Sequence, residues 1–550
     1  MPELQNAKSL LGKKWQIGSA PIAADLLSRL LQVRKISATT EFLQPDYAQQ
    51  GHAPELLKDF TKARERVERA INQGERILIV GDYDADGIAA AALLFKVLRS
   101  RTANVSVRLP HRVKHGYGLN QAFIQEAREL KVDLLITVDN GSAAYAEVCL
   151  AQEFGIDVII TDHHLPPSQL PPAYAILNPR RVDCAYPNKD LAGAAVAFKL
   201  ASSLNQDADL AAEILALATI GTVADVCEIS QENRALVASG LKVLARLPNP
   251  GLRQICQNAA LKANLTTEDI GFRLAPRLNA AGRLADPLLA FQALTHQEGA
   301  TFAQELEKLN LKRQKITQVA ERLALASLDR ESLPPVLVIF NPELPIGIIG
   351  LVAGKLAEKF FRPVLVFTEI EAGIVTGSAR CPQANFNITQ ALAQNADLLL
   401  KFGGHRTAAG CTLKKANLKL LEQRLTDFLV QELTEADLVP MLNLDLEVTL
   451  GELSLANFRE VQKLAPFGPG NLEPVFYLRQ VELKDLRLIG REQRHLKFWL
   501  KGTNLEVVGF NFGEQFAELQ ARSKFDLAFR LKENSWQQQT KLELQLVDLR

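Results

Sequence analysis

The sequence contains few cysteines and almost no net charge. Its 550 residues include six cysteines, and no two of them form a Cys-x-x-Cys pair. This argues against a zinc site and against a disulfide framework, and it is typical of a protein from a reducing cytosol. The formal net charge is only +1. Overall charge therefore does not indicate nucleic-acid binding, and any affinity for phosphate must be local.

Long apolar runs, internal repeats and low-complexity tracts are also missing. No apolar run is long enough to span a bilayer, and the first residues lack the charged-then-apolar pattern of a signal peptide. The remaining composition, 47% hydrophobic and 23% charged, is ordinary for a globular protein. Because 550 residues are too many for a single hydrophobic core, we expect several domains.

The most informative stretch is residues 81–87, which read Gly-Asp-Tyr-Asp-Ala-Asp-Gly. An apolar run at 76–80 precedes it and a stretch rich in helix formers at 88–95 follows, so three carboxylates lie on a predicted strand-to-helix turn. In open α/β sheets, ligands bind at such turns. Closely spaced carboxylates repel one another unless a cation lies between them, and hard oxygen ligands suit magnesium or manganese. A helix N-cap would explain one aspartate but not three at alternate positions.

Two further predicted strands end in polar groups. Residues 133–138 are followed by Asp139, and residues 156–160 by Thr-Asp-His-His. Strands that alternate with helices predict a parallel sheet with helices on both faces, so these strand ends share one edge. Taken singly, Asp139 fits a turn starter equally well, and Asp225 fits an exposed helix end better. The residues that we expect around metal are Asp82, Asp84, Asp86, Asp139, His163 and Asp225.

Changes in sequence pattern predict five segments. We expect a partly helical arm (1–60), an α/β domain (61–240), a helical region that ends in one long charged helix at 301–329 (241–333), a smaller α/β domain (334–438) and a small β-barrel (439–550). In the barrel, the aromatic residues at 498–499 and 510–512 are candidates for stacking on bases, although core packing explains any one of them better. Basic candidates for phosphate contacts there are Arg487, Arg491, Arg494 and Lys497.

Other candidate phosphate contacts are arginines in small-residue surroundings. Arg283 follows Asn-Ala-Ala-Gly, and Arg380 follows Gly-Ser-Ala. An arginine after small residues can approach a phosphate closely and bind it in a fork. The basic stretch around Arg112 is nearly as well explained by a solvated loop. Glycines and alanines on both sides of His405 permit close backbone approach to a substrate, or a tight structural turn.

Together the motifs resemble the DHH phosphoesterase superfamily. This resemblance rests on Gly-Asp-Tyr-Asp-Ala-Asp-Gly (81–87), Val-Asp-Asn-Gly (138–141), Asp-His-His (162–164) and Gly-Thr-Val-Ala-Asp (221–225). The run Gly-Gly-His-Arg-Thr-Ala-Ala-Gly (403–410) is similar to the DHHA1 domain that accompanies it. The resemblance is narrowed to the RecJ single-stranded-DNA exonucleases, over nearly the whole chain, by Asn-Ala-Ala-Gly-Arg (279–283), Gly-Ser-Ala-Arg (377–380) and Ala-Pro-Phe-Gly-Pro-Gly-Asn (465–471).

The resemblance implies an α/β fold in which a parallel-sheet DHH domain and a smaller DHHA1 domain face each other across a cleft. A long helix would join them, and an oligonucleotide-binding (OB) barrel would follow. It implies 5′-to-3′ hydrolysis of single-stranded DNA to mononucleotides, with two divalent cations, Mn2+ or Mg2+, in DNA repair and recombination. The residues that match metal ligands are Asp82, Asp84, Asp139, His163 and Asp225, and Asp86 and His164 match supporting catalytic positions. The residues that match substrate contacts are Arg112, Arg283, Ser378, Arg380, Gly404 and His405.

The implied partners are single-stranded DNA, a single-strand-binding protein and a helicase, and we expect a cytoplasmic monomer without membrane contact. Two alternatives remain open. One is a phosphodiesterase of very short oligonucleotides or cyclic dinucleotides, and the extra C-terminal domain argues against it. The other is a catalytically inactive DNA-binding scaffold, and the intact acidic set argues against that.

Overall fold

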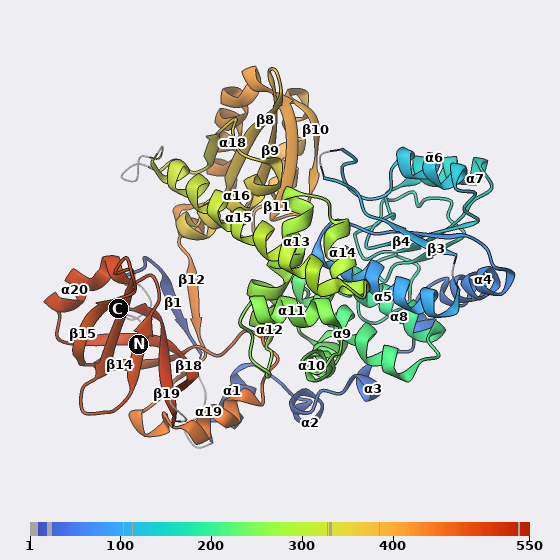
Figure 1. Cartoon of the computed structure of the whole chain (residues 1–550). Helices are drawn as coiled ribbons and strands as arrows, with labels where there is room; N and C mark the ends of the chain where they lie inside the picture. Colours follow the sequence, from blue (N-terminus) through green and yellow to red (C-terminus); the bar gives the residue numbers. More distant parts are fainter. Residues whose placement is uncertain are drawn as a thin grey trace. The chain divides into compact units, whose positions relative to one another are not determined.

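The protein is described by a computed structural model that covers residues 9–18, 25–102, 104–112, 114–326, 328, 333–383, 385–536 and 539–550 (Figure 1). The chain divides into two compact units. One consists of Met1–Gln44, Val430–Ala465 and Leu472–Arg550, and the other of Pro45–Leu429 and Pro466–Asn471. In the described part of the chain, no helix is both long enough and apolar enough to cross a bilayer. All six cysteines carry free thiols.

A five-stranded parallel sheet begins the larger unit. Its order is β3 (Val105–Arg108), β2 (Ile77–Val80), β4 (Leu134–Val138), β5 (Asp157–Thr161) and β6 (Ala175–Leu177). The central strand β2 reads Ile-Leu-Ile-Val and is wholly buried, as a parallel strand covered on both faces requires. The carboxyl ends of β2, β4 and β5 therefore lie along one edge, as predicted.

Helices cover both faces of this sheet (Figure 1). Ile77 and Ile79 face a core made with α5, α8 and α9, while Leu78 and Val80 face a core made with α6 and α7. The helices that surround the sheet are α4 (Phe60–Gln73), α5 (Ala85–Arg101), α6 (Gln121–Glu129), α7 (Tyr145–Glu153), α8 (Gly193–Leu204), α9 (Ala208–Ala224) and α10 (Gln231–Leu244).

A run of helices follows the sheet and ends in a long one. Helix α15 spans Gly299–Ala326, which agrees with the predicted long helix, although the predicted end at 329 lies outside the described residues. Helix α13 packs against α15 along its length and carries the Asn-Ala-Ala-Gly-Arg motif. The preceding elements are α11 (Pro250–Asn258), α12 (Thr267–Asp269), the π-helix η3 (Ile270–Leu274), α13 (Ala275–Leu284) and α14 (Leu288–Thr295).

A second five-stranded sheet follows α15 in the same unit. Only β7 and β8 are parallel to each other, whereas the other neighbouring pairs are antiparallel. Its order is β10 (Leu399–Gly404), β11 (Ala408–Lys414), β9 (Ile374–Arg380), β8 (Val364–Glu371) and β7 (Leu337–Phe340). Helix α16 (Ile346–Phe360) packs on β8 and β9, and α17 (Ile388–Ala393) and α18 (Leu418–Glu432) complete this smaller α/β domain.

The other unit is β-rich. Its seven-stranded, mainly antiparallel sheet has the order β13 (Leu446–Glu447), β14 (Phe476–Val481), β18 (Phe525–Trp536), β19 (Gln539–Leu549), β17 (Glu506–Gly509), β16 (His495–Leu500) and β15 (Leu483–Ile489). Among the aromatic residues that the sequence singles out, Phe498 and Phe512 are 0% and 5% exposed and belong to the core. Phe510 is 51% exposed, so it alone of these three presents most of an aromatic ring to solvent.

Part of the N-terminal arm belongs to this β-rich unit. Strand β1 (Lys14–Ile17) pairs in parallel with β12 (Met441–Leu444). Trp15 is buried against Tyr477 and Ala528, and its Nε1 donates a hydrogen bond to Oδ2 of the buried Asp548 (3.0 Å). The two paired segments are separated by most of the chain, and no local pattern in residues 1–60 indicates the pairing.

Candidate active site

The turn after β2 gives its three aspartates different partners. Asp84 is the N-cap of α5, and its Oδ1 accepts hydrogen bonds from the backbone N–H groups of Asp86 and Gly87 (3.0 and 3.1 Å). The Asp86 carboxylate accepts two hydrogen bonds from backbone N–H groups at the start of α8 (2.7 and 2.9 Å). Asp82 is buried, and its Oδ1 has no hydrogen-bond partner among the described residues. Gly87 has to be glycine, because a Cβ there would lie 2.6 Å from the Asp82 nitrogen.

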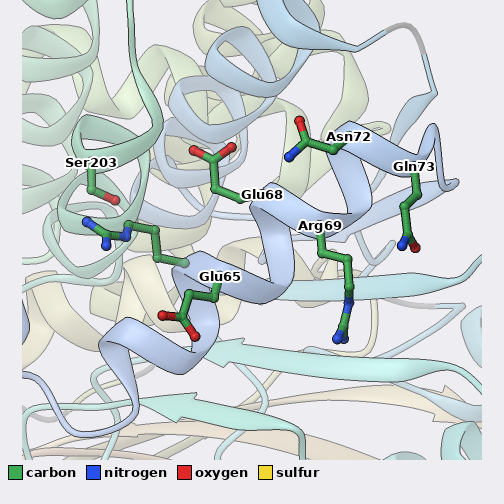
Figure 2. A pocket seen from close by; sticks show the side chains of 7 residues that line it. Glu65, Glu68, Arg69, Asn72, Gln73 and Ser203 are labelled. Carbon is green, nitrogen blue, oxygen red and sulfur yellow. The ribbon is translucent and has the colours of Figure 1, made fainter.

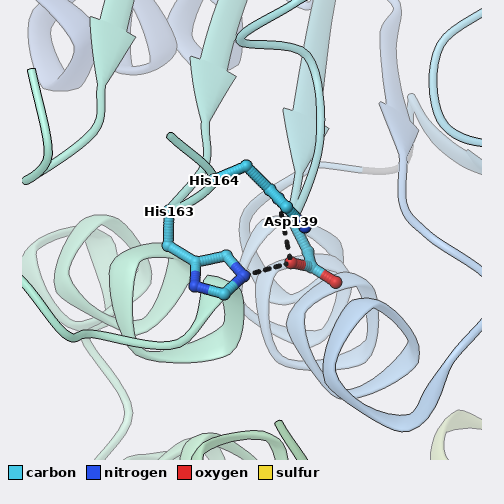
Figure 3. A group of neighbouring side chains, drawn as sticks. All are labelled: Asp139, His163 and His164. Atoms are coloured by element: carbon cyan, nitrogen blue, oxygen red, sulfur yellow. Dashed lines mark ion pairs between the residues drawn. The ribbon is translucent and has the colours of Figure 1, made fainter. Parts of the chain in front are cut away.

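The next two strands and the end of α9 complete the cluster. Asp139 follows β4, His163 follows β5, and Asp225 is the C-cap of α9. Nε2 of His163 lies 3.1 Å from Oδ1 of Asp139, and Nδ1 lies 3.6 Å from Oδ2 of Asp225. Figure 3 shows the His163 ring directed at the Asp139 carboxylate. Nδ1 of His164 instead lies 2.8 Å from Oδ1 of Asp162.

The donor set fits divalent cations. In each of three overlapping groups, the candidate ligand atoms lie within 4.8 Å of one another: Asp82, Asp84 and Asp139; Asp86, His163 and Asp225; Asp139, His163 and His164. Within the described chain, Oδ1 of Asp82, Oδ1 of Asp139 and Nδ1 of His163 are buried and make no hydrogen bond. Buried polar atoms are normally satisfied, and carboxylate oxygens with an imidazole nitrogen suit Mn2+ or Mg2+. Bound cations would satisfy the three open atoms.

Burial makes these carboxyls resist ionisation. The pKa of Asp82, of Asp86 and of Asp139 is raised well above its usual value, first by burial and then by the negative charge of neighbouring aspartates. Burial also raises the pKa of Asp225, although the nearby His163 opposes this shift. A cation among the four would remove both penalties, because it supplies the opposite charge at the place where water is excluded.

The pKa values of the two histidines shift in opposite directions. Burial lowers the pKa of His163, so its ring is neutral and a nitrogen lone pair is available to a metal. Burial, the largest single influence, disfavours the charged form of His164. The hydrogen bond with Asp162 and the negative charges of Asp162, Asp225 and Asp82 together outweigh burial and raise the pKa of His164 to about 9. Nε2 of His164 lies 3.0 Å from the hydroxyl of Tyr117. His164 is therefore held by two neighbours, which suits the supporting position that the sequence assigns to it.

Arginines gather beside the acidic turn. The backbone N–H of Ala85 donates to Oδ1 of Asn279 (2.8 Å), and a Cβ on Gly282 would lie 2.4 Å from the carbonyl oxygen of Tyr83. This close packing places Arg283, the last residue of the same motif, next to the turn. The guanidinium of Arg112 lies over the Tyr83 ring, 4.1 Å from its centroid.

Arg283 and Arg380 donate hydrogen bonds to uncharged groups. Arg283 donates to the carbonyl of Gly347 (3.0 Å), and Arg380 donates to the Ser378 hydroxyl (3.0 Å). In the described part of the chain, neither they nor Arg112 form an ion pair with a carboxylate. Burial, together with the positive charges of Arg112, Arg313 and Arg380, lowers the pKa of Arg283 to about 9. Crowded, desolvated guanidinium groups without counter-ions are a binding site for an anion such as phosphate.

Three sequence models of known families match the chain. The DHH family, N-terminal domain, matches residues 76–222; the DHHA1 domain matches residues 334–432; the RecJ OB domain matches residues 444–548. The single-stranded-DNA-specific exonuclease RecJ of Salmonella typhimurium is 34% identical over 567 residues, which cover 96% of this chain and 97% of that protein. The chain belongs to the RecJ family. The family resemblance that the motifs indicate is confirmed.

Other RecJ proteins agree. The RecJ of Escherichia coli is 33% identical and covers 94% of each chain. The RecJ of Bacillus subtilis is 36% identical over 507 residues. The match covers 90% of this chain but only 64% of the Bacillus subtilis protein, which is longer. A crystal structure of RecJ from Thermus thermophilus in complex with Mn2+ has a TM-score of 0.83 at 30% identity and covers 98% of this chain and 79% of that one. A Mg2+ complex of the same protein has a TM-score of 0.76. The predicted RecJ fold class is thereby confirmed.

The hairpin of the DHHA1 domain brings His405 to the histidines of the DHH domain. The ring of His405 stacks on that of His164, with centroids 6.1 Å apart and planes 23° apart. Gly404 has a φ of +142°, and a Cβ there would lie 2.5 Å from the carbonyl oxygen of Ala408. Glycine is therefore needed at this position for β10 to approach β11 closely just before His405. The motif thus forms a tight structural turn and also positions His405.

Sequence reasoning missed three residues of the site. Asp162 anchors His164 and also accepts a hydrogen bond from the backbone N–H of Ser142 (2.9 Å). Its place directly before two histidines was a usable signal. Tyr117 approaches from a loop, and Arg313 comes from the middle of α15, where it is one of many charged residues. No local motif distinguishes these two.

A hollow of about 530 Å3 on α4 is a different kind of site (Figure 2). Several of its charged groups already have partners. Glu68 pairs with Arg101 (2.7 Å), and Arg69 lies 4.0 Å from Asp157. None of the predicted site residues lines it. The residues that do are Arg64, Glu65, Glu68, Arg69, Asn72, Gln73 and Ser203.

Proposed function

We propose that this RecJ-family protein is a metal-dependent 5′-to-3′ exonuclease that is specific for single-stranded DNA and releases mononucleotides, in DNA repair and recombination. Its relatives from Salmonella typhimurium and Escherichia coli are named single-stranded-DNA-specific exonucleases, and solved RecJ structures hold Mn2+ or Mg2+. One observation carries the proposal. A buried acidic cluster with unsatisfied ligand atoms lies beside a cluster of arginines that have no carboxylate partners in the described chain.

In this proposal, two divalent ions would be held by Asp82, Asp84, Asp139, His163 and Asp225. Two such ions, when bound, supply positive charge to the phosphodiester that is cleaved and generate the nucleophile from water at neutral pH. Asp86 ties the acidic turn to α8, and the contact between His164 and Asp162 fixes the second histidine. These anchors hold the ligands in place before substrate arrives, so little reorganisation is needed during the reaction.

Arg283, Arg380 and Ser378 bind the terminal 5′-phosphate in this account. Their position beside the acidic turn would place the first internucleotide linkage over the metal centre. Arg112 adds positive charge, and its guanidinium group packs over the Tyr83 ring. His405 and Gly404 approach from the DHHA1 domain, where the stacked His405 would contact the substrate. The acidic groups thus perform the chemistry, and the arginines select the end of the strand.

A degradation assay tests this function. A long single strand and a two-nucleotide substrate are incubated with the protein, with and without Mn2+. We expect Mn2+-dependent release of mononucleotides from both, with strong preference for the single strand over a blunt duplex. Cleavage of the two-nucleotide substrate alone would favour a phosphodiesterase of short oligonucleotides. Binding without cleavage would favour a scaffold.

The sequence also predicts domain limits, a cellular location, an oligomeric state and protein partners. We propose domain limits at 1–60, 61–240, 241–333, 334–438 and 439–550. We also propose that the protein acts in the cytoplasm as a monomer, on strands coated by a single-strand-binding protein and opened by a helicase. A mass near 60.6 kDa in solution would support the monomer.

A further inference from the structure

The loop Pro466–Asn471 folds back onto the catalytic unit, although the residues on both sides of it belong to the β-rich unit. The loop is closed internally, because Gly468 and Asn471 exchange two backbone hydrogen bonds (2.9 and 3.0 Å). Its carbonyl groups point outward and accept hydrogen bonds from the catalytic unit. Pro469 accepts from the backbone N–H of Ile229 (2.7 Å), and Phe467 accepts from the hydroxyl of Thr267 (2.5 Å).

The contact with Ile229 is close as well as hydrogen-bonded. A Cβ on Gly468 would lie 2.5 Å from Cγ1 of Ile229. Ile229 is only 1% exposed. Further along the loop, Arg234 donates to the carbonyl of Pro466 (3.1 Å). The loop therefore contacts Ile229 both at its backbone N–H and at its side chain.

Ile229 ends a short segment that begins at the proposed metal ligand Asp225. Between them, Val226 has a φ of +62°. A β-branched residue rarely adopts this left-handed conformation, because its side chain crowds the backbone. Val226 is 67% exposed, so side-chain packing does not compensate for the strain. Such a conformation persists only where the surrounding structure holds the segment. Here the backbone N–H of Cys227 donates to the carbonyl of Thr222 (3.3 Å) and that of Glu228 to Oδ2 of Asp190 (2.7 Å), and the loop adds the anchor at Ile229.

We propose that the loop Pro466–Asn471 is a positioning element for Asp225. By holding Ile229 it keeps Val226 in the left-handed conformation, and this conformation directs the Asp225 carboxylate toward His163 and the metal centre. The inference rests on the metal role of Asp225 in the proposed function. It also gives the Ala-Pro-Phe-Gly-Pro-Gly-Asn motif a task in the active site, which the overall family resemblance does not explain.

The test is a calorimetric titration of the metal-free, full-length protein with Mn2+. In the variant Gly468→Ala the new methyl group displaces Ile229, so the affinity of one Mn2+ site should fall about tenfold, the factor that corresponds to one non-glycine residue in this conformation. The other Mn2+ site should remain unchanged. Gly451→Ala is the matched control, because no atom lies within 4 Å of a Cβ at that position.

A rescue variant separates positioning from a general loss of structure. Glycine adopts a positive φ without strain, so Val226→Gly should restore the Mn2+ affinity of Gly468→Ala. If Gly468→Ala does not fold, Thr267→Val removes one hydrogen bond to the loop and should weaken the same Mn2+ site by about threefold, in keeping with the worth of a single hydrogen bond.

The variant Asp225→Asn distinguishes an error in the metal assignment of Asp225 from an error in the positioning role of the loop. If it leaves both Mn2+ sites unchanged, Asp225 is not a ligand and the metal assignment fails. If it weakens one site while Gly468→Ala binds Mn2+ like the parent, the positioning role is wrong. Equal weakening of both sites in Gly468→Ala, with a lower melting temperature that Val226→Gly does not restore, would make the loop a purely structural contact.

Discussion

The three aspartates of the turn after β2 perform three different tasks. Asp82 leaves a buried oxygen open, Asp84 caps α5, and Asp86 fastens α8. The sequence alone posed metal binding and helix capping as alternatives for this turn. In the structure, Asp84 caps α5 and also belongs to the candidate metal cluster. A substitution of Asp84 can therefore affect both the stability of the helix and metal binding.

Asp84 offers a test that separates its two tasks. We expect Asp84→Ala and Asp84→Asn both to lose Mn2+-dependent nuclease activity, because each removes a charged ligand. Only the Asp84→Ala variant should also have a lower free energy of unfolding, by about 1 kcal/mol, because asparagine can still cap the helix. Activity and thermal melting are measured on the same samples. Activity near that of the parent in either variant would contradict the metal assignment.

The raised pKa values of Asp82, Asp86 and Asp139 predict how pH affects the metal-free protein. The folded state binds these protons more tightly than the unfolded chain, so the contribution of these three groups to stability is fully present below the ordinary aspartate pKa near 4 and is lost as pH rises through the folded values. Mn2+ offsets that loss, and we expect its effect on the melting temperature to be larger at about pH 7.5 than at about pH 5. An equal effect at both values would contradict the buried, cation-dependent cluster.

At the scale of elements, helices α13 and α16 meet beside the arginine cluster. A Cβ on Gly347 would lie 2.2 Å from the carbonyl oxygen of Arg283, so glycine permits this close contact. The alternation of strands and helices was enough to predict the first sheet and the strand ends that carry Asp139 and His163. Asp225 was harder to place, because a helix end does not show locally that it packs toward a sheet edge.

The arginine cluster predicts selective loss of end recognition. Arg283→Ala and Arg380→Ala should each lower kcat/KM on 5′-phosphorylated strands by about ten- to a hundredfold, since a charge-assisted contact is worth roughly 1.5–3 kcal/mol. Strands with a 5′-hydroxyl should be affected much less. Arg322→Ala, an exposed arginine on α15, is the control. Equal losses on both kinds of strand would make these arginines general backbone contacts or structural residues.

At the scale of the whole molecule, the part of the N-terminal arm up to Gln44 and the C-terminal sheet form one unit. Periodicity and composition predicted the β-rich region, but they do not show which distant strand completes it. Pairing of β1 with β12 depends on tertiary packing around Trp15. A chain that ends near Val439 would therefore leave Trp15 without its neighbours, and it would also lack the loop Pro466–Asn471. Surface substitutions are the cleaner way to test the role of this unit.

Phe510 and Arg487 provide such substitutions. Phe510 is 51% exposed, and the Arg487 guanidinium lies over the Trp499 ring, 5.1 Å from its centroid. We expect Phe510→Ala to weaken binding of long single strands with little change in salt dependence, because stacking on a base is worth about 1–3 kcal/mol. Arg487→Ala should instead make the salt dependence shallower. Neither should alter hydrolysis of a two-nucleotide substrate. Unchanged affinity for long strands in both variants would favour a protein partner for this surface.

The polarity of degradation tests the central claim most directly. A 5′-phosphorylated single strand is labelled at its 5′ end or at its 3′ end and is digested with Mn2+ present. We predict that the 5′ label appears as a mononucleotide at the earliest times, while the 3′ label remains on a ladder of shortening strands. Early release of the 3′ label, or equal digestion of a blunt duplex, would contradict an enzyme whose arginine cluster receives the 5′-phosphate of a single strand.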